Sequence, residues 1–470
     1  MQKAPPKRLH FIGIGGTGMR PLAEIAIADG YLVSGSDQSA SVSTAFLEKM
    51  GAQITIGHRP EALPTERCTL VLSSAIPPDN AELKLAQEKS WPMIHRSDLL
   101  RELMQGRQAI CVSGTHGKTS TTAMLAFMLE ALGEDPRAAV GGEMVDRESF
   151  ALLGKGRFFV AECDESDGSF LKYDPYISIV TNIDLDHLDY YKDLEGLKAA
   201  FLQFARKTAV DGCAIFGWDN ASAREIAHQY QGHRLSFGQR IGSEVRSLAF
   251  RSLGFEAHYE AIVHQELVRD HAPLVGRYNL QNILCCLAVA SFLELDIQAA
   301  AASLRHYPGV KRRFSLVSTV DKVKIFDDYA HNPGKIRSCI EGAREAFPND
   351  RLIVIFQPHR YSRLETMYNE LMGSFRAADE VFVLPVYAAG ETSQRDFSPS
   401  SLAEDMRQAS GVKANAYDHV ALGRLLQHPS ESTVLITVGA GDVWQLGLEW
   451  KDFLHEQAAQ KKGTPGGTKA

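Results

Sequence analysis

The chain has 470 residues, of which 44% are hydrophobic and 23% charged, and its formal net charge is −7. This length is too great for one core and suggests about three domains, and the composition is that of a soluble globular protein. The acidic balance argues against a nucleic-acid partner. Seven scattered cysteines without a Cys-x-x-Cys pair indicate a reducing, cytoplasmic setting and no structural zinc site. We expect no membrane span and no secretory signal, because long apolar stretches are missing.

A βαβ pattern opens the chain. Residues 9–14 are expected to form a buried strand, 15–18 a turn and 19–29 a helix, and further strands are expected at 31–35 and 70–74. Strands that alternate with helices predict a parallel sheet covered on both faces.

The turn after the first strand has the spacing Gly13-x-Gly15-x-x-Gly18, and Asp37 follows about twenty residues on. This is the dinucleotide fingerprint, in which glycines let a diphosphate approach a helix N-terminus. The same glycines also allow tight packing of the helix on the strand. The pattern therefore predicts a diphosphate site but does not name the nucleotide.

A second phosphate-binding pattern lies between the apolar residues 109–112 and the helical segment 121–132, and reads Gly114-Thr115-His116-Gly117-Lys118-Thr119-Ser120. In such a loop the backbone N–H groups cradle phosphates, the lysine reaches the outer phosphates and the threonine holds Mg²⁺. Gly114 stands closer to Gly117 than the strict P-loop pattern requires. The pattern predicts a nucleoside triphosphate site, with an ordinary strand–helix turn as the alternative. A second nucleotide site also argues against a simple NAD-dependent oxidoreductase.

Acidic residues follow the buried strand expected at 158–161. Glu162 is the first of them, and it stands where a Mg²⁺ ligand is expected, because the carboxyl ends of parallel strands line the crevice of such a sheet. A solvated acidic loop at 162–167 is the alternative. After the next strand, 177–180, His187 follows an Asp-x-Asp pair and is predicted to bind a metal or a phosphate, with a structural histidine as the alternative.

Asn279 and Asn282 are three residues apart, so they share one face of the helix that continues to Leu295. They are predicted to contact a base or a phosphate, and helix capping is the alternative. The basic run 311–313 is either a solvated patch or a source of fixed positive charge for phosphoryl transfer.

A third α/β unit is expected after Pro308, with strands at 324–326, 352–356, 380–384 and 434–438. Titratable residues follow two of these strands. Arg360 and Arg363 are suited to binding a substrate carboxylate bidentately.

These motifs together resemble the ATP-dependent Mur ligases of peptidoglycan synthesis. The resemblance extends over nearly the whole chain, and its further motifs are Asp327-Asp328-Tyr329-Ala330-His331, Pro358-His359-Arg360-Tyr361-Ser362-Arg363 and Tyr387-Ala388-Ala389-Gly390-Glu391. It implies an α/β fold of three domains: an N-terminal Rossmann-like domain, a central P-loop-type ATPase with a mostly parallel sheet, and a C-terminal Rossmann-like domain. The expected boundaries are 1–106 for the UDP-sugar domain, 107–310 for the ATP domain, 311–456 for the amino-acid domain and 457–470 for a disordered tail.

The resemblance also implies roles for individual residues. Those expected at the UDP-sugar are Gly15, Gly16, Thr17, Gly18, Asp37, Ser73, Ser74 and His116. Those expected at ATP are Gly114, Thr115, His116, Gly117, Lys118, Thr119, Ser120, Asn279, Asn282, Arg313 and Asp328. Thr119, Glu162 and His187 are expected to hold Mg²⁺ at two sites, with Mn²⁺ as an alternative ion. Tyr329, His331, Arg360 and Arg363 are expected at the amino acid. Lys118, His187, Arg313 and Asp328 are the expected catalytic residues.

The function implied is cytoplasmic ligation of L-alanine to UDP-N-acetylmuramate through an acyl phosphate, by a monomer or homodimer. Alternatives are a recycling ligase that adds the L-Ala-γ-D-Glu-meso-diaminopimelate tripeptide, a relative with another acceptor or amino acid, and a non-catalytic UDP-sugar or nucleotide-binding regulator. Four departures from the family pattern bear on the choice. Residues 200–203 lack the lysine that several relatives carbamylate, which favours the alanine-adding branch. Asn332 stands where a histidine is common, Thr17 replaces an alanine, and the segment between Arg313 and Asp327 is short.

Overall fold

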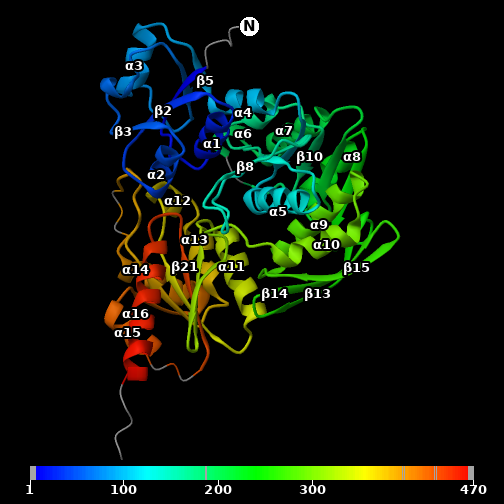
Figure 1. Ribbon diagram of the computed structural model, residues 1–470. Coiled ribbons are helices and arrows are strands. Elements are labelled where there is room, and N and C mark those ends of the chain that lie inside the picture. Colours follow the sequence, from blue (N-terminus) through cyan, green and yellow to red (C-terminus); the bar gives the residue numbers. More distant parts are fainter. Residues whose placement is uncertain are drawn as a thin grey trace, which may run out of the picture. The chain divides into compact units, whose positions relative to one another are not determined.

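The computed structural model (Figure 1) describes residues 7–185, 188–393, 395, 397–427, 429 and 431–463. The chain divides into two compact units. The first runs to residue 249 and adds 259–271 and 281–308, and the second contains 250–258, 272–280 and the chain from 309 onward. Within the described part of the chain, no helix has the length and apolar character needed to cross a membrane.

Five parallel strands form the N-terminal sheet, in the order β3-β2-β1-β4-β5. Their bounds are β1 (Arg8–Ile12), β2 (Leu32–Asp37), β3 (Gln53–Ile56), β4 (Thr69–Leu72) and β5 (Met93–His95). The helices of this region are α1 (Arg20–Ala28), α2 (Val42–Lys49), α3 (Ala81–Glu88) and α4 (Arg96–Met104), with the 3₁₀ helix η1 (Pro60–Ala62). With β1 at its centre, the sheet is doubly wound in the Rossmann manner and brings the carboxyl ends of β1, β2 and β4 together.

The central sheet has ten strands in the order β15-β14-β13-β12-β11-β10-β6-β9-β7-β8. Their bounds are β6 (Gln108–Ser113), β7 (Arg137–Ala139), β8 (Ala151–Leu153), β9 (Phe158–Glu162), β10 (Ile177–Val180), β11 (Cys213–Gly217), β12 (Arg234–Gly238), β13 (Val245–Leu253), β14 (Glu256–Val263) and β15 (Glu266–Ala272). Its helices are α5 (Lys118–Ala131), α6 (Leu188–Tyr191), α7 (Leu194–Arg206), α8 (Ala221–Gln229), α9 (Arg277–Phe292) and α10 (Ile297–Ser303), with η2 (Ser169–Lys172) and η3 (Leu304–His306). β6 pairs in parallel with both β9 and β10, so the predicted phosphate loop, residues 114–120, follows a strand inside the sheet.

The C-terminal sheet has the order β16-β17-β21-β18-β19-β20, parallel except for β16. Its strands are β16 (Ser315–Val320), β17 (Val323–Asp328), β18 (Arg351–Phe356), β19 (Glu380–Val383), β20 (Lys413–Ala416) and β21 (Thr433–Val438). Its helices are α11 (Pro333–Ala346), α12 (Tyr361–Thr366), α13 (Tyr368–Met372), α14 (Pro399–Ser410), α15 (His419–Gln427) and α16 (Trp444–Gly463), with η4 (Gly373–Phe375). The carboxyl ends of β17 and β18 flank that of β21 and carry the predicted amino-acid residues.

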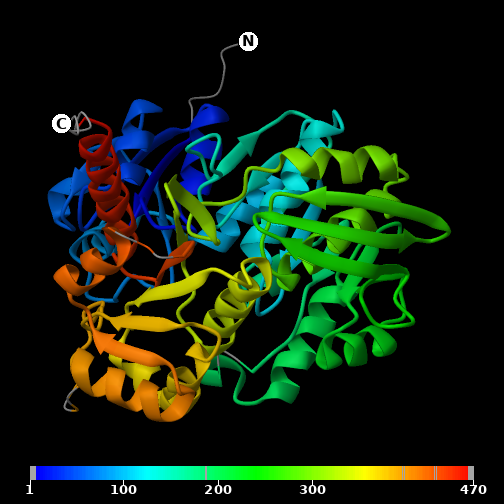
Figure 2. The ribbon, with the colours of Figure 1, turned by 90° about the horizontal axis from the view of Figure 1, so that it is seen from below.

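Three mostly parallel α/β sheets confirm the predicted fold class. The strands β13–β15, which lie side by side in Figure 2 in green, were not predicted. The expectation of a disordered tail from residue 457 is wrong for residues 457–463. There α16 continues, because Trp450 and Leu454 are buried against the C-terminal sheet and Ala458 packs on the same cluster. Residues 464–470 lie outside the described residues.

Candidate active site

The loop between β6 and α5 has the backbone of an anion cradle. Gly114 and Gly117 have φ values of +137° and +85°, a region that residues with side chains rarely adopt. A Cβ on Gly114 would lie 2.0 Å from the hydroxyl oxygen of Thr181, so only glycine fits there. Gly117 is the N-cap of α5, and no side chain caps this helix. Its N-terminal N–H groups and its dipole therefore favour an anionic ligand.

Residues after β10 brace this loop. The N–H groups of Thr115 and His116 donate to the carbonyl and the Oδ1 of Asn182, at 3.1 and 2.8 Å. The Thr181 hydroxyl donates to the His116 carbonyl at 2.7 Å. These bonds hold a loop that is shorter than the strict P-loop pattern. The sequence reasoning gave Thr181 and Asn182 no role of their own, although a polar pair directly after a buried strand was the available signal.

Lys118 is the first residue of α5, and its ammonium is held inside the loop. Its Nζ donates to the Gly114 carbonyl at 2.7 Å and to Glu165 Oε1 at 2.9 Å. Burial lowers the pKa of Lys118, but the carboxylates of Glu165, Asp164 and Glu162 together outweigh this effect and raise the pKa above its usual value. Lys118 is therefore a fixed positive charge at neutral pH.

Thr119 and Glu162 form a corner of oxygen atoms beside the loop. The Thr119 hydroxyl donates to Glu162 Oε1 at 3.2 Å, and the Gly141 N–H donates to Oε2 at 2.9 Å. A Cβ on Gly141 would lie 2.3 Å from Glu162 Oε2, so glycine is needed for this approach. A hydroxyl and a carboxylate on the ends of neighbouring elements are ligands that suit Mg²⁺.

The predicted metal ligand His187 lies outside the described residues. Among the residues that are described, no three His, Cys, Asp or Glu side chains gather closely enough to hold a metal by themselves. The loop leading to His187 is fixed at Asp184, whose carboxylate accepts from Asn220 Nδ2 at 2.9 Å and whose N–H donates to the Thr115 hydroxyl at 3.0 Å.

The other acids after Glu162 have partners, so this run is not a merely solvated loop. Asp164 Oδ2 accepts from Arg96 Nη2, and Asp167 Oδ2 accepts from the Ser74 hydroxyl, both at 2.8 Å. Arg96 and Ser74 belong to the N-terminal sheet region. The acidic run therefore joins the phosphate loop to the region where the UDP-sugar residues were predicted.

The glycine turn after β1 lies beside the end of β2. The Gly15 N–H donates to Asp37 Oδ2 at 2.9 Å, and Gly13 has a φ of +77°. A Cβ on Gly18 would lie 3.4 Å from Arg96 Nη1. Gly16 and Thr17 complete this turn, and Ser73 and Ser74 follow the neighbouring strand β4. The predicted UDP-sugar residues of the first domain thus lie at the carboxyl ends of the adjacent strands β1, β2 and β4.

Sequence reasoning missed a buried polar network under this turn. Glu82 is fully buried, and its carboxylate accepts from the Ser36 hydroxyl at 2.7 Å and contacts His10 Nε2 at 2.8 Å and His58 Nδ1 at 3.1 Å. Burial raises the pKa of Glu82, but its bonds with His10 and Ser36 outweigh this and lower it. Ser36 precedes Asp37, so the network supports the carboxylate that accepts from the glycine turn. Ser34 and Ser36, which stand at alternate positions of β2, were the available signal.

The two asparagines lie in the first turns of α9, which begins at Arg277, so neither is its N-cap. In the first unit, Asn282 Oδ1 accepts from the Thr121 hydroxyl at 2.8 Å and lies 3.2 Å from where a Cβ on Gly117 would stand. In the second unit, Asn279 Nδ2 donates to the Val275 carbonyl at 2.8 Å. Asn282 therefore belongs to the surroundings of the phosphate loop.

Arg313 of the second unit is flanked by strained backbone, because Arg312 and Phe314 have φ values of +62° and +48°. Its guanidinium lies 5.5 Å from the ring centroid of Tyr329. Asp328 accepts from the N–H groups of Phe314 and Ala330 at 2.8 and 2.7 Å. Burial raises the pKa of Asp328 to about 6. Such strain is typical of functional segments, and here it flanks Arg313 and includes Phe314, whose N–H donates to Asp328.

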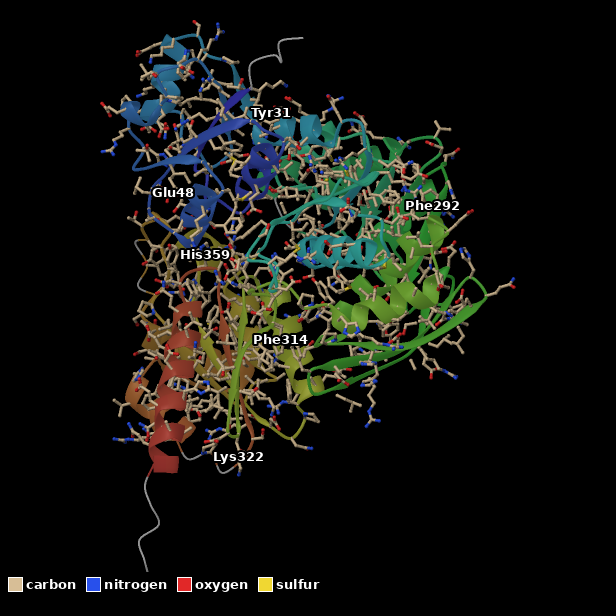
Figure 3. All side chains as sticks on the ribbon, in the orientation of Figure 1. Tyr31, Glu48, Phe292, Phe314, Lys322 and His359 are labelled. Carbon is tan, nitrogen blue, oxygen red and sulfur yellow. The ribbon has the colours of Figure 1, made fainter. Side chains whose placement is uncertain are left out.

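The predicted amino-acid residues lie after β17 and β18. The ring of His331 is 5.2 Å from that of Tyr329 and 6.3 Å from that of His359, which is labelled in Figure 3. His359 stacks on Tyr387 at 5.5 Å, and its Nδ1 lies 3.1 Å from Arg363 Nη1. Sequence reasoning assigned His359 and Tyr387 no role, although both stand in the quoted motifs.

Both histidines of this cluster are neutral at neutral pH. Burial, aided by Lys335 and Arg363, lowers the pKa of His331 to about 2. Burial and the guanidinium groups of Arg363 and Arg360 lower the pKa of His359 to about 4. Arg360 itself has a φ of +65°, and its guanidinium lies 3.9 Å from the Glu391 carboxylate.

The asparagine at position 332, where a histidine is common in the family, has a local structural role. It is the N-cap of α11, and its side-chain oxygen accepts from the Lys335 N–H at 2.9 Å. Asparagine is among the best N-cap residues, so the departure at this position strengthens the start of a helix beside His331.

Three family models match the chain. They are the Mur ligase family catalytic domain over residues 8–108, the Mur ligase middle domain over 112–290, and the Mur ligase glutamate ligase domain over 312–441. A UDP-N-acetylmuramate–L-alanine ligase of Dictyoglomus turgidum is 38% identical over 449 residues, which are 94% of this chain and 96% of that protein. One of Syntrophomonas wolfei is 36% identical over 97% of this chain and 99% of its own length. The crystal structure of a UDP-N-acetylmuramate-alanine ligase from Thermotoga maritima matches with a TM-score of 0.82 and 27% identity, covering 96% of this chain and 99% of that one.

Proposed function

The chain belongs to the Mur ligase family, and we propose that it joins L-alanine to the lactyl carboxylate of UDP-N-acetylmuramate while ATP is converted to ADP and phosphate. The observation that carries the proposal is the grouping of Lys118, Thr119 and Glu162 around a glycine loop. This grouping occurs in a chain that aligns over nearly its full length with relatives of that activity.

The first step is transfer of the γ-phosphoryl group to the substrate carboxylate, which gives an acyl phosphate and ADP. Negative charge is spread over the transferred group in this step, so fixed positive charge and aligned N–H groups are what the protein must provide. Lys118 supplies the charge, and the N-terminal N–H groups of α5 supply the donors. Thr181 and Asn182 keep the loop in shape.

Thr119 and Glu162 would hold a Mg²⁺ ion, and we propose His187 as the ligand of a second one. When bound, the ion neutralises charge on the phosphates and orients them. The Gly141 N–H holds the Glu162 carboxylate in place for this task. Mn²⁺ is proposed as an alternative ion.

The second step is attack of the amine of L-alanine on the acyl phosphate, with release of phosphate. Arg360 and Arg363 are proposed to bind the carboxylate of the amino acid. Neutral His331 and His359 add no positive charge that would repel the amine, because burial keeps their pKa low. Tyr329 is proposed to contact the amino acid as well.

The remaining assignments are proposals of the same kind. The turn residues 15–18, Asp37, Ser73, Ser74 and His116 are proposed to contact the UDP-sugar. Asn279, Asn282, Arg313 and Asp328 are proposed to contact the nucleotide. The domain boundaries are proposed at 106 and 310, and the protein is proposed to act in the cytoplasm as a monomer or homodimer.

The test is phosphate release from ATP in the presence of Mg²⁺ and UDP-N-acetylmuramate, with L-alanine, L-serine, glycine and the tripeptide L-Ala-γ-D-Glu-meso-diaminopimelate assayed in parallel. We expect the highest kcat/KM with L-alanine. Turnover with the tripeptide alone would make the chain a recycling ligase. No turnover with any of the amino acids or the tripeptide would make it a non-catalytic binder.

A further inference from the structure

Glu165 was given no role by the sequence, yet its side chain is fully buried and faces the phosphate loop. Both its carboxylate oxygens lie beside Lys118 Nζ, Oε1 at 2.9 Å and Oε2 at 2.8 Å. We propose that Glu165 is a positioning residue for phosphoryl transfer, which acts by holding the Lys118 ammonium where the γ-phosphate is expected. The inference rests on the proposed role of Lys118 in the reaction with ATP.

The lysine tip is held from two neighbouring strands. Gly114 follows β6, and its carbonyl accepts from Nζ at 2.7 Å. Glu165 follows β9, which pairs with β6 in parallel, with Val112 opposite Glu162. A lysine side chain is a flexible four-carbon stem that loses much rotamer freedom when it is fixed. A carbonyl on one side and a carboxylate on the other define its position far better than the carbonyl alone.

Glu165 is itself anchored, so it can serve as the fixed partner of the pair. Its carbonyl accepts from the Gly168 N–H at 3.0 Å and from the Tyr191 hydroxyl. Tyr191 is buried in the core of the first unit, and Phe170 after Gly168 belongs to the same core. The carboxylate therefore projects from backbone that is tied to the core through the turn at Gly168 and through Tyr191.

The negative charge of Glu165 favours a role in positioning the Lys118 ammonium over a role in affinity for ATP. A carboxylate near a phosphate site repels the anion, and it partly cancels the attraction of the lysine for ATP. A site built for tight nucleotide binding alone would omit it. A site built for transfer gains from it, because the rate depends on where the positive charge lies relative to the moving phosphoryl group.

Asp164, the preceding residue, provides a matched control. It carries the same charge in the same loop, but its carboxylate pairs with Arg96 at 2.8 Å, and no hydrogen bond joins it to Lys118 among the described contacts. Asp164→Asn removes one negative charge from the acidic run and leaves the Lys118 pair intact. It therefore separates a general charge effect from a specific one.

The experiment compares the wild type with Glu165→Gln, Glu165→Asp and Asp164→Asn. Because both oxygens of Glu165 contact Nζ, glutamine would turn an N–H donor toward the ammonium at one of the two positions and release the lysine. We expect Glu165→Gln to lower kcat at least tenfold, with KM for UDP-N-acetylmuramate within twofold of wild type. Glu165→Asp keeps the charge and should retain more of kcat than the glutamine variant. Asp164→Asn should stay within threefold of wild type.

Metal dependence and thermal stability distinguish a positioning role from a metal-binding or a structural one. A tenfold rise in the Mg²⁺ concentration for half-maximal activity in Glu165→Gln would make Glu165 a metal ligand and overturn the proposal. Equal losses of kcat in the glutamine and aspartate variants, with melting temperatures well below wild type, would make it a structural ion pair and overturn it too. Wild-type kcat in Glu165→Gln together with an inactive Lys118→Ala would refute this inference alone. An active Lys118→Ala would refute the proposed role of Lys118 from which it follows.

Discussion

The predicted phosphate loop, residues 114–120, and the proposed amino-acid cluster, formed by Tyr329, His331, His359, Arg360 and Arg363, hold their positive charges in opposite ways. Lys118 is 14% exposed at its side chain and touches a buried carboxylate at 2.8 Å. Arg360 is 51% exposed at its side chain, and Glu391 is 3.9 Å away. The first charge is fixed before any ligand arrives, while the second is presented to solvent on strained backbone. The contrast fits the two ligands that we propose, because a phosphoryl group needs charge at a set point and a free amino acid needs to be captured from solution.

The largest effect is expected where the charge is fixed. Lys118→Ala should lower kcat by about three orders of magnitude, the size of effect that a transition-state cation has in phosphoryl transfer. Binding of UDP-N-acetylmuramate should survive, because the glycine turn after β1 does not use this lysine. Phosphate release and calorimetric titration of the UDP-sugar measure the two effects. Retained turnover would remove Lys118 from the phosphate site.

The shape of the loop should matter nearly as much as its charge. Gly114→Ala would place a Cβ 2.0 Å from the Thr181 hydroxyl at a φ of +137°, so the loop must move and ATP-dependent activity should be lost. Gly133→Ala is the matched control: its φ is +81°, and nothing lies within 4 Å of the added atom. It should cost about 1 kcal/mol of stability from backbone strain and leave turnover intact. Similar activities in the two variants would show that the close packing of Gly114 is not needed.

The sequence was sufficient for features that depend on local pattern. We could predict the strand–glycine–helix order around Gly114 and Lys118, and also the acids after β9. Turns and strand ends depend on residues that are adjacent in the sequence. The Lys118–Glu165 pair and the network of His10, Glu82 and Ser36 were not found. The partners in each of these contacts are 46 or more positions apart along the chain, and no pattern in a single sequence joins residues so far apart.

The ends of elements were also hard to predict. Residues 457–463 are poor in apolar side chains, but they continue a helix whose anchors, Trp450 and Leu454, lie earlier. The strands β13–β15 were missed although β14 alternates buried and less buried residues along its length, which is the period of a half-covered strand. In both places tertiary packing decided a structure that local composition left open.

A smaller effect is expected where the charge is exposed. Arg360→Ala should raise KM for L-alanine roughly 10- to 100-fold, the loss expected for charge-assisted hydrogen bonds worth about 1.5–3 kcal/mol. KM for ATP should change less than threefold. Arg376→Ala removes another arginine of the second unit, whose guanidinium contacts the Ala409 carbonyl, and should alter neither constant. Equal changes in both KM values for Arg360→Ala would contradict a carboxylate clamp.

The smallest effect is a pH dependence of stability that arises in the second unit. The folded pKa of His359 is about 4 and its usual value is 6.5, so its contribution is present above pH 6.5 and is lost as the pH falls toward 4. Asp328 acts in the opposite direction, because its folded pKa of about 6 lies above its usual value of 3.8. Its contribution is complete below pH 3.8 and is lost as the pH rises through 6.

Between pH 6 and pH 4 the contributions of the two residues to stability therefore change in opposite directions. The melting temperatures of their variants should differ from wild type in opposite directions as well. His359→Gln should flatten the fall in the melting temperature of the second unit on acidification by about 2–4 °C, which corresponds to about 1 kcal/mol for a unit of roughly 150–250 residues. Asp328→Asn should steepen the fall by a similar amount, since it removes the group that gains stability in acid. Parallel curves for His359→Gln and wild type would mean that His359 is not held neutral by its surroundings, and the amino-acid cluster would then carry a positive charge at mildly acidic pH.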